Sequence, residues 1–425
     1  MTRPASFNDS LMTSPRRVVV TGLGAITPIG IGLEAVSASL RAERSAVGMI
    51  TRFDPSPFRT HIAAQVNDFS AEDHLDAKRV KRLDRFGQLS VIAANMAMAD
   101  AGIDLAKESR ENIGVMMGTA LAGVGYAEEQ LGRYLVGGLR AVDATLALAV
   151  FGGASSCNIA IETGVQGPNS TNAMSCASGA IAIGEAYRQV RDGYADVMIG
   201  GGAEAPLAPL CFGAFALIRA MSTRNDDPAR ASRPFDAERD GFVMGEGGAA
   251  LILEERNRAL ARGARIYGEI IGFGTTNDAH HMTAPLPGGA QAARAMQQAL
   301  SRAGLTASDV DYVNAHASAT PLNDPTEVDA MRTVFGPALD DVWVSGTKGY
   351  HGHALGASGA IEAMICMLAF RDGWLPPTVN LEHSDARCEL RHVPSGGTTT
   401  APDVIMSNSF GFGGINASLV FRAPD

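Results

Sequence analysis

Short apolar runs alternate with segments of helical spacing along this chain. The runs predict buried strands, because their apolar residues are almost continuous. They lie at Ile113–Met117, Val197–Ile199, Ala249–Leu253, Val310–Val313, Val342–Val344, Val404–Met406 and Ala417–Phe421. Helical spacing occurs at Gln88–Gly102, Ala290–Gly304 and Thr326–Phe335. Strands in alternation with helices predict an α/β protein built of layers.

One segment of the sequence occurs twice. Ala177–Ile181 and Ala357–Ile361 both read Ala-Ser-Gly-Ala-Ile, and Arg-Asp-Gly follows each copy at the same spacing. Small residues on nearly every side of the first copy predict a helix that is buried between sheets, and the same holds for the second copy. Cys176 directly precedes the first copy and His353 shortly precedes the second. The repeat therefore predicts a duplicated fold whose halves meet at one nucleophilic site.

A charged stretch, Glu254–Arg265, marks the predicted boundary between the two halves. We expect an N-terminal half over residues 17–265, which carries the candidate nucleophile Cys176. The C-terminal half over residues 266–425 carries the candidate histidines. Residues 1–16 lack an apolar run of signal-peptide length and are expected to form a flexible tail.

Composition narrows the possible partners. The net charge of −10 at pH 7 argues against nucleic acid. A membrane-spanning helix needs about 18 consecutive apolar residues, and no such run occurs. The five cysteines include no Cys-x-x-Cys pair, which argues for reduced thiols in a cytoplasmic protein and against a disulfide frame or zinc knuckle.

Lys78–Arg85 is a basic cluster in this acidic chain. Such a cluster is typical of a solvated helix face, and equally of a patch that binds an acidic partner. The residues alone leave both interpretations open.

Cys176 lies between a polar extended run and the first predicted buried helix. The positive end of a helix dipole favours a thiolate, and the N–H groups of that turn suit an oxyanion. A buried structural cysteine is the alternative. The position at the helix start favours a nucleophile.

Two histidines occupy comparable places in the second half. His316 follows a predicted strand, and His353 precedes the second buried helix. His351 and His353 have the spacing of a metal-ligand pair, but no third ligand has suitable spacing, so no metal site is expected. The glycine-rich segment Asn408–Gly414 carries two aromatic residues and is interpreted as a flap over a pocket, or else as a turn with two core phenylalanines.

These motifs together resemble the elongating, type II β-ketoacyl-acyl-carrier-protein synthases of the thiolase superfamily. The resemblance runs from about Arg17 to Phe421. Its most specific segments are Arg219–Asp226, Ser232–Asp236, Arg239–Val243, Lys348–His353 and Asn408–Gly414. It implies a five-layered αβαβα thiolase-like fold of two similar halves, acting as a homodimer. It also implies acyl-carrier protein as the partner, and no cofactor beyond the phosphopantetheine on that carrier.

The resemblance implies a role for each matching residue. Cys176 takes the acyl group as a thioester. His316 and His353 assist decarboxylation of the malonyl donor and stabilise the enolate. Lys348 holds the hydrogen-bond network of the site, with Glu327 as its carboxylate partner. Two histidines indicate the elongating rather than the initiating class, and the absence of a cysteine from the last glycine-rich loop argues against a thiolase.

Further roles follow from the same resemblance. The N–H groups of Cys176 and Phe412 form an oxyanion hole, and the Phe412 side chain is a gate. The residues that contact pantetheine or substrate are Ser318, Thr320, Phe410 and Phe412. The acyl pocket contains Leu121 and Phe215. The residues that dock the carrier are Lys78, Lys81, Arg82 and Arg219.

Two short segments depart from the family pattern, and His316–Thr320 reads His-Ala-Ser-Ala-Thr where the family usually has His-Gly-Thr-Ser-Thr. Ala317 replaces a glycine after His316, and Ala120 and Ala122 replace the glycines that flank Leu121. These changes leave the acyl chain length open, and with it the choice between fatty-acid elongation and a specialised lipid or polyketide pathway. A non-catalytic subunit that controls chain length is a further alternative, against which Cys176 counts. The sequence also leaves open a structural cation near Asn314 and Glu362.

Overall fold

One mixed sheet of 11 strands runs through the molecule, whose computed structural model describes residues 15–425. Its order is β11-β10-β14-β15-β9-β1-β8-β7-β5-β6, with β2 paired to β1. The first strand group is β6 (Asn169–Asn172), β5 (Ile113–Gly118), β7 (Val197–Glu204), β8 (Gly247–Glu255) and β1 (Val18–Thr27). The second strand group is β11 (Trp343–Ser345), β10 (Tyr312–Asn314), β14 (Val404–Gly411), β15 (Ile415–Arg422) and β9 (Gly268–Asn277). All but the last two residues of the predicted tail, 1–16, lie outside the described part.

The two strand groups have the same order and the same strand directions. In the first, β5 is parallel to β6 and β7, and β8 is antiparallel to β7 and β1. In the second, β10 is parallel to β11 and β14, and β15 is antiparallel to β14 and β9. A short antiparallel pairing of Val18–Val20 in β1 with β9 joins the groups. The topology therefore repeats, as the sequence repeat predicts.

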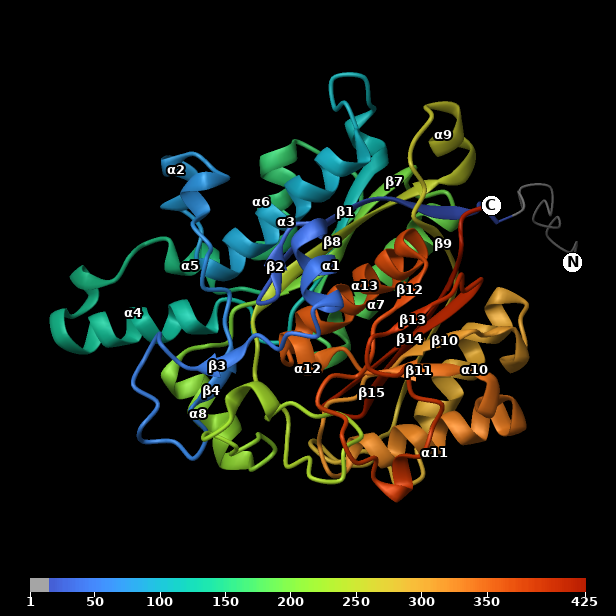
Figure 1. The fold of residues 1–425 in the computed structure, drawn as a ribbon. Coiled ribbons are helices and arrows are strands. Elements are labelled where there is room, and N and C mark those ends of the chain that lie inside the picture. Colours follow the sequence, from blue (N-terminus) through green and yellow to red (C-terminus); the bar gives the residue numbers. More distant parts are fainter. Residues whose placement is uncertain (1–14) are drawn as a thin grey trace, which may run out of the picture.

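Helices lie between the strand groups and on both outer faces (Figure 1). α7 (Ser178–Arg191) and α13 (Ser358–Asp372) contact each other and strands of both groups. α3 (Arg85–Ala101) with α6 (Ala154–Thr163) covers the outer face of the first group. α10 (Ala290–Ala303), with α11 (Asn323–Phe335) beside it, covers the second. The predicted five-layered αβαβα fold is confirmed.

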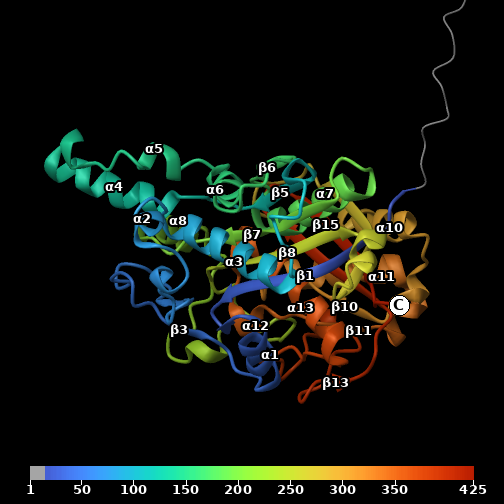
Figure 2. The same ribbon diagram turned by 90° about the horizontal axis from the view of Figure 1, so that it is seen from above.

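The remaining elements lie between or beside these layers. The strands among them are β2 (Gly30–Ile31), β3 (Val47–Met49), β4 (Ile62–Ala64), β12 (Trp374–Leu375) and β13 (Thr398–Thr399). The helices are α1 (Leu33–Arg41), α2 (Ala77–Val80), α4 (Val124–Gly137), α5 (Leu146–Ala149), α8 (Pro209–Ile218), α9 (Arg256–Ala261) and α12 (Lys348–His351). Figure 2 shows α4 and α5 projecting from the rest of the molecule. None of the helices within residues 15–425 has the length and apolar character that crossing a bilayer requires.

Local signals set the ends of the helices. α3 begins at Arg85, a few residues before the predicted start, because the Asp84 side chain accepts a hydrogen bond from Gly87 N at 2.9 Å. Gly102 ends the helix in the left-handed conformation that glycine adopts without strain. The buried helices α7 and α13 each follow a short 3-10 turn, at Ser175–Ala177 and Leu355–Ala357. The repeated sequence therefore forms repeated structure.

α7 and α13 cross so closely that both crossing positions require glycine. A Cβ on Gly179 would lie 2.8 Å from the backbone N of Ala360. A Cβ on Gly359 would lie 2.7 Å from the backbone N of Ala180. Each copy of the Ala-Ser-Gly-Ala-Ile segment thus packs against the other, and the starts of the two helices come together.

We predict that Gly359→Ala lowers the free energy of unfolding by about 2 kcal/mol, because the added methyl group overlaps the backbone N and the Cβ of Ala180 on the crossing helix. Thermal or urea unfolding measures the effect. The matched control is Gly132→Ala in α4, where nothing lies within 4 Å of the added methyl. That change should stabilise the protein by about 0.5–1 kcal/mol. Equal stability of the two variants would contradict the crossing described here.

Candidate active site

A cavity of about 300 Å³ brings the predicted nucleophile and both predicted histidines together. Cys176 lies in the turn before α7, His316 follows β10, and His353 lies between α12 and α13. The rings of His316 and His353 are 5.4 Å apart between centroids and nearly perpendicular. Phe410 and Phe412, predicted to contact the substrate, line the same cavity.

Cys176 is a buried thiol. Burial raises the pKa of Cys176 above its ordinary value, and hydrogen bonds from Ser175 and from the Phe412 backbone N–H oppose the rise only in part. The sequence led us to expect that the helix start favours the thiolate. Loss of water contact is the largest influence on this pKa, so burial favours the thiol over the thiolate.

The loop after β14 reaches the nucleophile through a glycine. A Cβ on Gly411 would lie 3.0 Å from the backbone N of Cys176 and 3.3 Å from that of Ala177. This approach brings the Phe412 N–H to the Cys176 sulfur. The Phe412 ring stacks on Phe215, with ring centroids 6.3 Å apart and an angle of 13° between the planes. The loop therefore supplies both a backbone donor and an aromatic wall.

Both histidines of the cavity are neutral. Burial first, and then the charge of Lys348, lower the pKa values of His316 and His353 well below the ordinary range. The Lys348 ammonium faces His316 Nδ1 at 3.4 Å, so the neutral His316 ring carries its proton on Nε2. His353 Nδ1 shares a hydrogen bond of 2.8 Å with Ser358 Oγ. Neutral imidazoles in this cavity can donate hydrogen bonds to a developing oxyanion.

The carboxylate partner of Lys348 is Glu362, so the predicted partnership with Glu327 is wrong. Lys348 Nζ donates to Glu362 and to the backbone O of His316, the latter at 2.6 Å. Burial raises the pKa of Glu362 to about 7, although Lys348 opposes the rise. Glu362 lies on α13, and the sequence offered no signal for which carboxylate would face the lysine.

Glu327 has a different position in the supporting network. Its two carboxylate oxygens accept the backbone N–H groups of His316 and Ala317, each at 2.8 Å. Glu327 therefore anchors the start of the segment that follows β10. Ser318 and Thr320, the predicted pantetheine contacts, lie in that segment and line the cavity.

A second cavity of about 400 Å³ contains both predicted acyl-pocket residues. Leu121 and Phe215 line it together with side chains of α4 and α8. Phe215 also lines the catalytic cavity, so this ring lies between the two. The sequence missed Glu204 at the end of β7, which accepts N–H groups from Leu121 and Gly356 at 3.0 Å each. Glu204 thereby links Leu121, in the predicted acyl pocket, to the segment after His353.

The sequence also missed Phe242 as part of the site. Its ring meets His353 edge-on, with centroids 5.4 Å apart, and it lines the catalytic cavity. Phe242 belongs to the Arg239–Val243 motif, whose family resemblance was the only available signal. His281 and Met282 line the cavity as well. Both lie in a loop after β9 whose sequence gave no indication of this position.

The four predicted docking residues are all exposed, but they lie in two places. Lys78, Lys81 and Arg82 lie on and just after α2, whereas Arg219 follows α8 and lines the catalytic cavity. Figure 1 shows α2 and α8 well apart. In the same basic run Arg79 turns inward and pairs with Glu162 at 2.8 Å.

The sequence left open whether a structural cation binds near Asn314 and Glu362. The structure has two buried side-chain oxygens at this place. Asn314 Oδ1 and Glu362 Oε2 are buried, and neither accepts a hydrogen bond within the described part of the chain. Across residues 15–425, no three His, Cys, Asp or Glu side chains are grouped as metal ligands. His351, the other half of the possible metal pair, instead bonds Thr347 Oγ1 at 3.2 Å.

Comparison with known families gives this geometry its context. The profile described as Beta-ketoacyl synthase, N-terminal domain, matches residues 15–259, and the C-terminal domain profile matches residues 267–382. This chain belongs to the β-ketoacyl synthase family.

Individual β-ketoacyl synthases match over nearly the whole chain. The 3-oxoacyl-[acyl-carrier-protein] synthase 2 of Synechocystis sp. is 46% identical, over 96% of this chain and 98% of the relative. The protein of the same name from Staphylococcus aureus strain COL is 41% identical, over 97% and 99%. The solved structure of AntDE:AntF, a type II PKS acyl-carrier protein in complex with its ketosynthase bound to the hexaketide, matches with a TM-score of 0.91. Its identity is 33%, covering 97% of this chain and 100% of that chain.

We predict that iodoacetamide alkylates Cys176 with a midpoint above pH of about 8.5, the value of an ordinary thiol, because burial raises the pKa. Peptide mass spectrometry across a pH series measures the rate. The exposed Cys157, followed in the same digests, shows that the reagent is active at each pH. A midpoint below that of an ordinary thiol would mean that the helix start and Lys348 control the sulfur.

Proposed function

We propose that this protein elongates fatty acids by decarboxylative Claisen condensation. An acyl group on Cys176 is joined to malonyl-acyl-carrier protein, which gives β-ketoacyl-acyl-carrier protein, CO2 and free carrier. One observation carries the proposal: a single cavity is lined by a buried thiol and two neutral imidazoles. The 46% identity with a 3-oxoacyl-[acyl-carrier-protein] synthase 2 supports the same reaction.

In the first half-reaction Cys176 Sγ attacks the carbonyl carbon of the acyl-carrier thioester. The carrier sulfur leaves and takes the proton of the Cys176 thiol, so charge balances. The N–H groups of Cys176 and Phe412 donate to the carbonyl oxygen as it gains negative charge. The position of the Phe412 N–H against the sulfur supports this role.

In the second half-reaction the malonyl group loses CO2, and the electron pair of that bond remains on the methylene carbon. No strong base is needed. His316 and His353 donate hydrogen bonds to the thioester oxygen of the enolate, a role their neutral state supports. The carbanion attacks the Cys176 thioester, and the sulfur leaves as a thiolate that regains a proton from solvent. Lys348 Nζ donates a hydrogen bond to the backbone O of His316 and thereby holds His316 in place.

The substrate arrives on the phosphopantetheine of the carrier, so the proposed reaction needs no further cofactor and no metal. The hydroxyls of Ser318 and Thr320 and the ring of Phe410 line the path of the pantetheine arm. Leu121 and Phe215 contact the growing acyl chain, as the lining of the second cavity supports. Lys78, Lys81, Arg82 and Arg219 attract the acidic carrier, a role that their exposure supports.

A ketosynthase of a polyketide pathway is the second candidate. The likeness to the AntDE:AntF ketosynthase supports it, at 33% identity. Fatty-acid elongation stands first, because the identity with the 3-oxoacyl-[acyl-carrier-protein] synthase 2 of Synechocystis sp. is higher, at 46%. The buried thiol of Cys176 in the cavity argues against a non-catalytic chain-length subunit.

We further propose that the protein is a cytoplasmic homodimer that binds no nucleic acid. Large apolar side chains are exposed along α4 and the turn after it, a surface that suits a second copy of this chain. They are Leu131, Tyr134, Leu135, Val136 and Leu139. All five cysteines are free, which supports a reducing compartment, and the net charge of −10 argues against nucleic acid. A sedimentation-velocity measurement that gives the mass of a single chain would contradict the proposed dimer.

We predict that Cys176→Gln abolishes condensation, because no acyl thioester can form, but leaves malonyl-carrier decarboxylation to His316 and His353. Product analysis measures β-ketoacyl-carrier and CO2 separately. In the wild type, intact-mass measurement should find one acyl adduct at Cys176 after incubation with acyl-carrier protein. The proposal fails if the wild type forms no adduct, and the division of roles fails if the variant loses decarboxylation completely.

We predict that Lys81→Glu with Arg82→Glu raises the apparent KM for malonyl-carrier about tenfold at low salt, because two attractive charges become repulsive. Steady-state kinetics at several salt concentrations measures the effect, which should shrink as salt rises. The matched control is Lys107→Glu with Arg294→Glu, two exposed charges outside the α2 region. An equal rise of KM in both double variants would assign the effect to net charge rather than to docking.

A further inference from the structure

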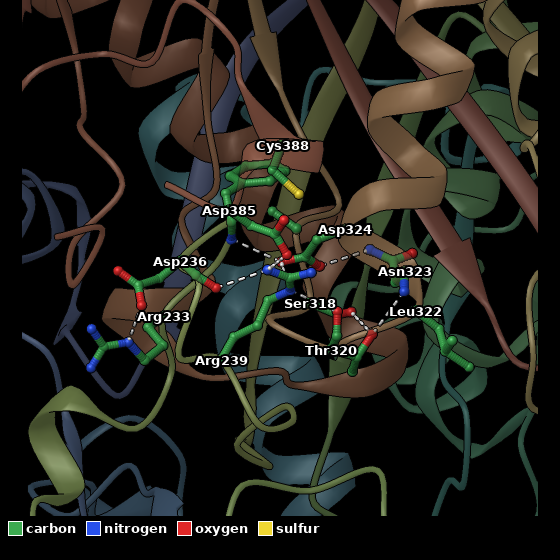
Figure 3. A network of polar contacts seen from close by, with 12 residues as sticks. Arg233, Asp236, Arg239, Ser318, Thr320, Leu322, Asn323, Asp324, Asp385 and Cys388 are labelled. Atoms are coloured by element: carbon green, nitrogen blue, oxygen red, sulfur yellow. Dashed lines mark hydrogen bonds and ion pairs between the residues drawn. The ribbon is translucent and has the colours of Figure 1, made fainter. Parts of the chain in front are cut away.

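Two sequence motifs, Ser232–Asp236 and Arg239–Val243, have no role in the reaction described above, yet they form a buried polar network beside the cavity (Figure 3). Within this network two arginines are almost completely buried. The exposed fractions of the Arg233 and Arg239 side chains are 1% and 2%. Burying a guanidinium costs free energy unless carboxylates or carbonyls pair with it. Packing alone does not explain why two arginines are buried at this place in the fold.

Arg239 directly holds the wall of the catalytic cavity. Its Nε donates to the backbone O of Thr320 at 3.1 Å. Its Nη1 donates to Asp385 Oδ2 at 2.9 Å and to the backbone O of Asp236 at 2.8 Å. Asp324, on α11, lies 3.7 Å from the guanidinium. Figure 3 shows Arg239 between these acidic groups and the Ser318–Thr320 segment.

The segment held by Arg239 is strained. Ala317 and Ala319 have φ of 42° and 63°, in the left-handed region where a Cβ crowds the backbone. Both alanines are fully buried. Left-handed non-glycine residues persist only where surrounding contacts hold them. Glu327 holds the start of this segment and Arg239 holds its end.

Two hydroxyls of this strained segment line the cavity. Ser318 Oγ and Thr320 Oγ1 share a hydrogen bond of 3.1 Å, and both residues line the cavity. Thr320 Oγ1 also accepts Asn323 N at 3.1 Å, at the start of α11. The carbonyl of Thr320 is the backbone group that Arg239 binds, so the arginine acts on the hydroxyls through the backbone.

The loop that carries Arg239 also carries Phe242, which forms another part of the cavity wall. Phe242 lines the cavity and packs edge-on against His353. Its backbone pairs with Ala220 and Ser222, at 3.0 and 2.9 Å, directly after Arg219. One short loop therefore connects the Ser318–Thr320 wall, through Arg239, to the Phe242 wall.

We propose that Arg239 is a positioning residue for the carrier-bound substrate: it holds the strained Ala317–Thr320 segment so that the Ser318 and Thr320 hydroxyls face the pantetheine arm. This inference rests on the proposed function for the identity of that substrate. Arg239 touches no reacting atom, so its effect falls on substrate binding rather than on the chemical steps at Cys176.

The geometry requires arginine rather than lysine. Nε and Nη1 of one planar group reach Thr320 on one side and Asp385 on the other. A lysine ammonium is a single point on a flexible chain and cannot hold both positions in this fixed geometry. Arg239→Lys thus keeps the positive charge beside Asp324 and Asp385 and removes the bridge.

The experiment compares Arg239→Lys with Arg233→Lys. Arg233 is the matched control, because it lies in the same loop, is equally buried and pairs with Asp236 at 2.8 Å without contacting the 317–320 segment. Arg239→Lys is expected to raise KM for malonyl-carrier about tenfold with kcat changed less than twofold. Arg233→Lys is expected to lower the unfolding temperature and leave KM within twofold.

A mutant cycle tests whether Arg239 acts through the hydroxyls. In a Ser318→Ala background, Arg239→Lys should raise KM less than threefold, because the hydroxyl pair is already broken. If Arg239→Lys does not fold, Arg239→Gln keeps a shorter neutral donor and is compared in the same way. An equal KM rise in the Arg239 and Arg233 variants, or a full tenfold effect in the Ser318→Ala background, would overturn the proposal.

A readout without turnover separates this inference from the proposed function. An electrophilic pantetheine analogue and iodoacetamide both label Cys176, but only the analogue passes along the Ser318–Thr320 wall. Arg239→Lys should slow labelling by the analogue about tenfold relative to iodoacetamide, and equal slowing of both would overturn the inference. If the wild type labels normally but performs no condensation, the proposed function fails, and the labelling ratio still decides the role of Arg239.

Discussion

The close crossing of α7 and α13 is the constraint on which the rest of the structure depends. Glycine at 179 and at 359 lets the two helix backbones approach within a distance that any side chain would prevent. Each helix start then lies beside the other, so Cys176 and His353 line one cavity although they belong to different halves of the chain. The strand groups on either side follow the same approximate symmetry.

Burial controls the chemistry of the site that this crossing creates. Removal from water keeps the Cys176 sulfur protonated and both imidazoles neutral, so the cavity faces an incoming thioester with hydrogen-bond donors rather than with charges. The charge of Lys348 lies behind this wall and is paired with Glu362. A thioester carbonyl is itself neutral, and a cavity of this kind stabilises it most when it becomes an oxyanion.

The sequence predicted the features that depend on a local pattern of residues. It missed the contacts between residues that are far apart in the chain. The repeat indicated two buried helices and one shared site, because small residues at helical spacing need close packing wherever they occur. Glu327 and Glu362 are both acidic residues on helices of the second half, and only the three-dimensional structure shows which of them faces Lys348. Glu204 and Phe242 reach the site across large sequence separations, which a single sequence does not encode in any local signal.

The order of strands in the second group has a consequence for how the chain acquires its fold. β14 and β15 are made after β9, β10 and β11, yet they lie between β9 and the β10–β11 pair. Until they are synthesised, β10 and β11 have no sheet connection to the rest of the protein. Phe412 lies in the turn between β14 and β15, so the reactive cavity is also incomplete until then. A ribosome-bound chain lacking these strands therefore holds Cys176 in a first half that cannot yet carry out condensation, and closure of the second half is a late step in folding.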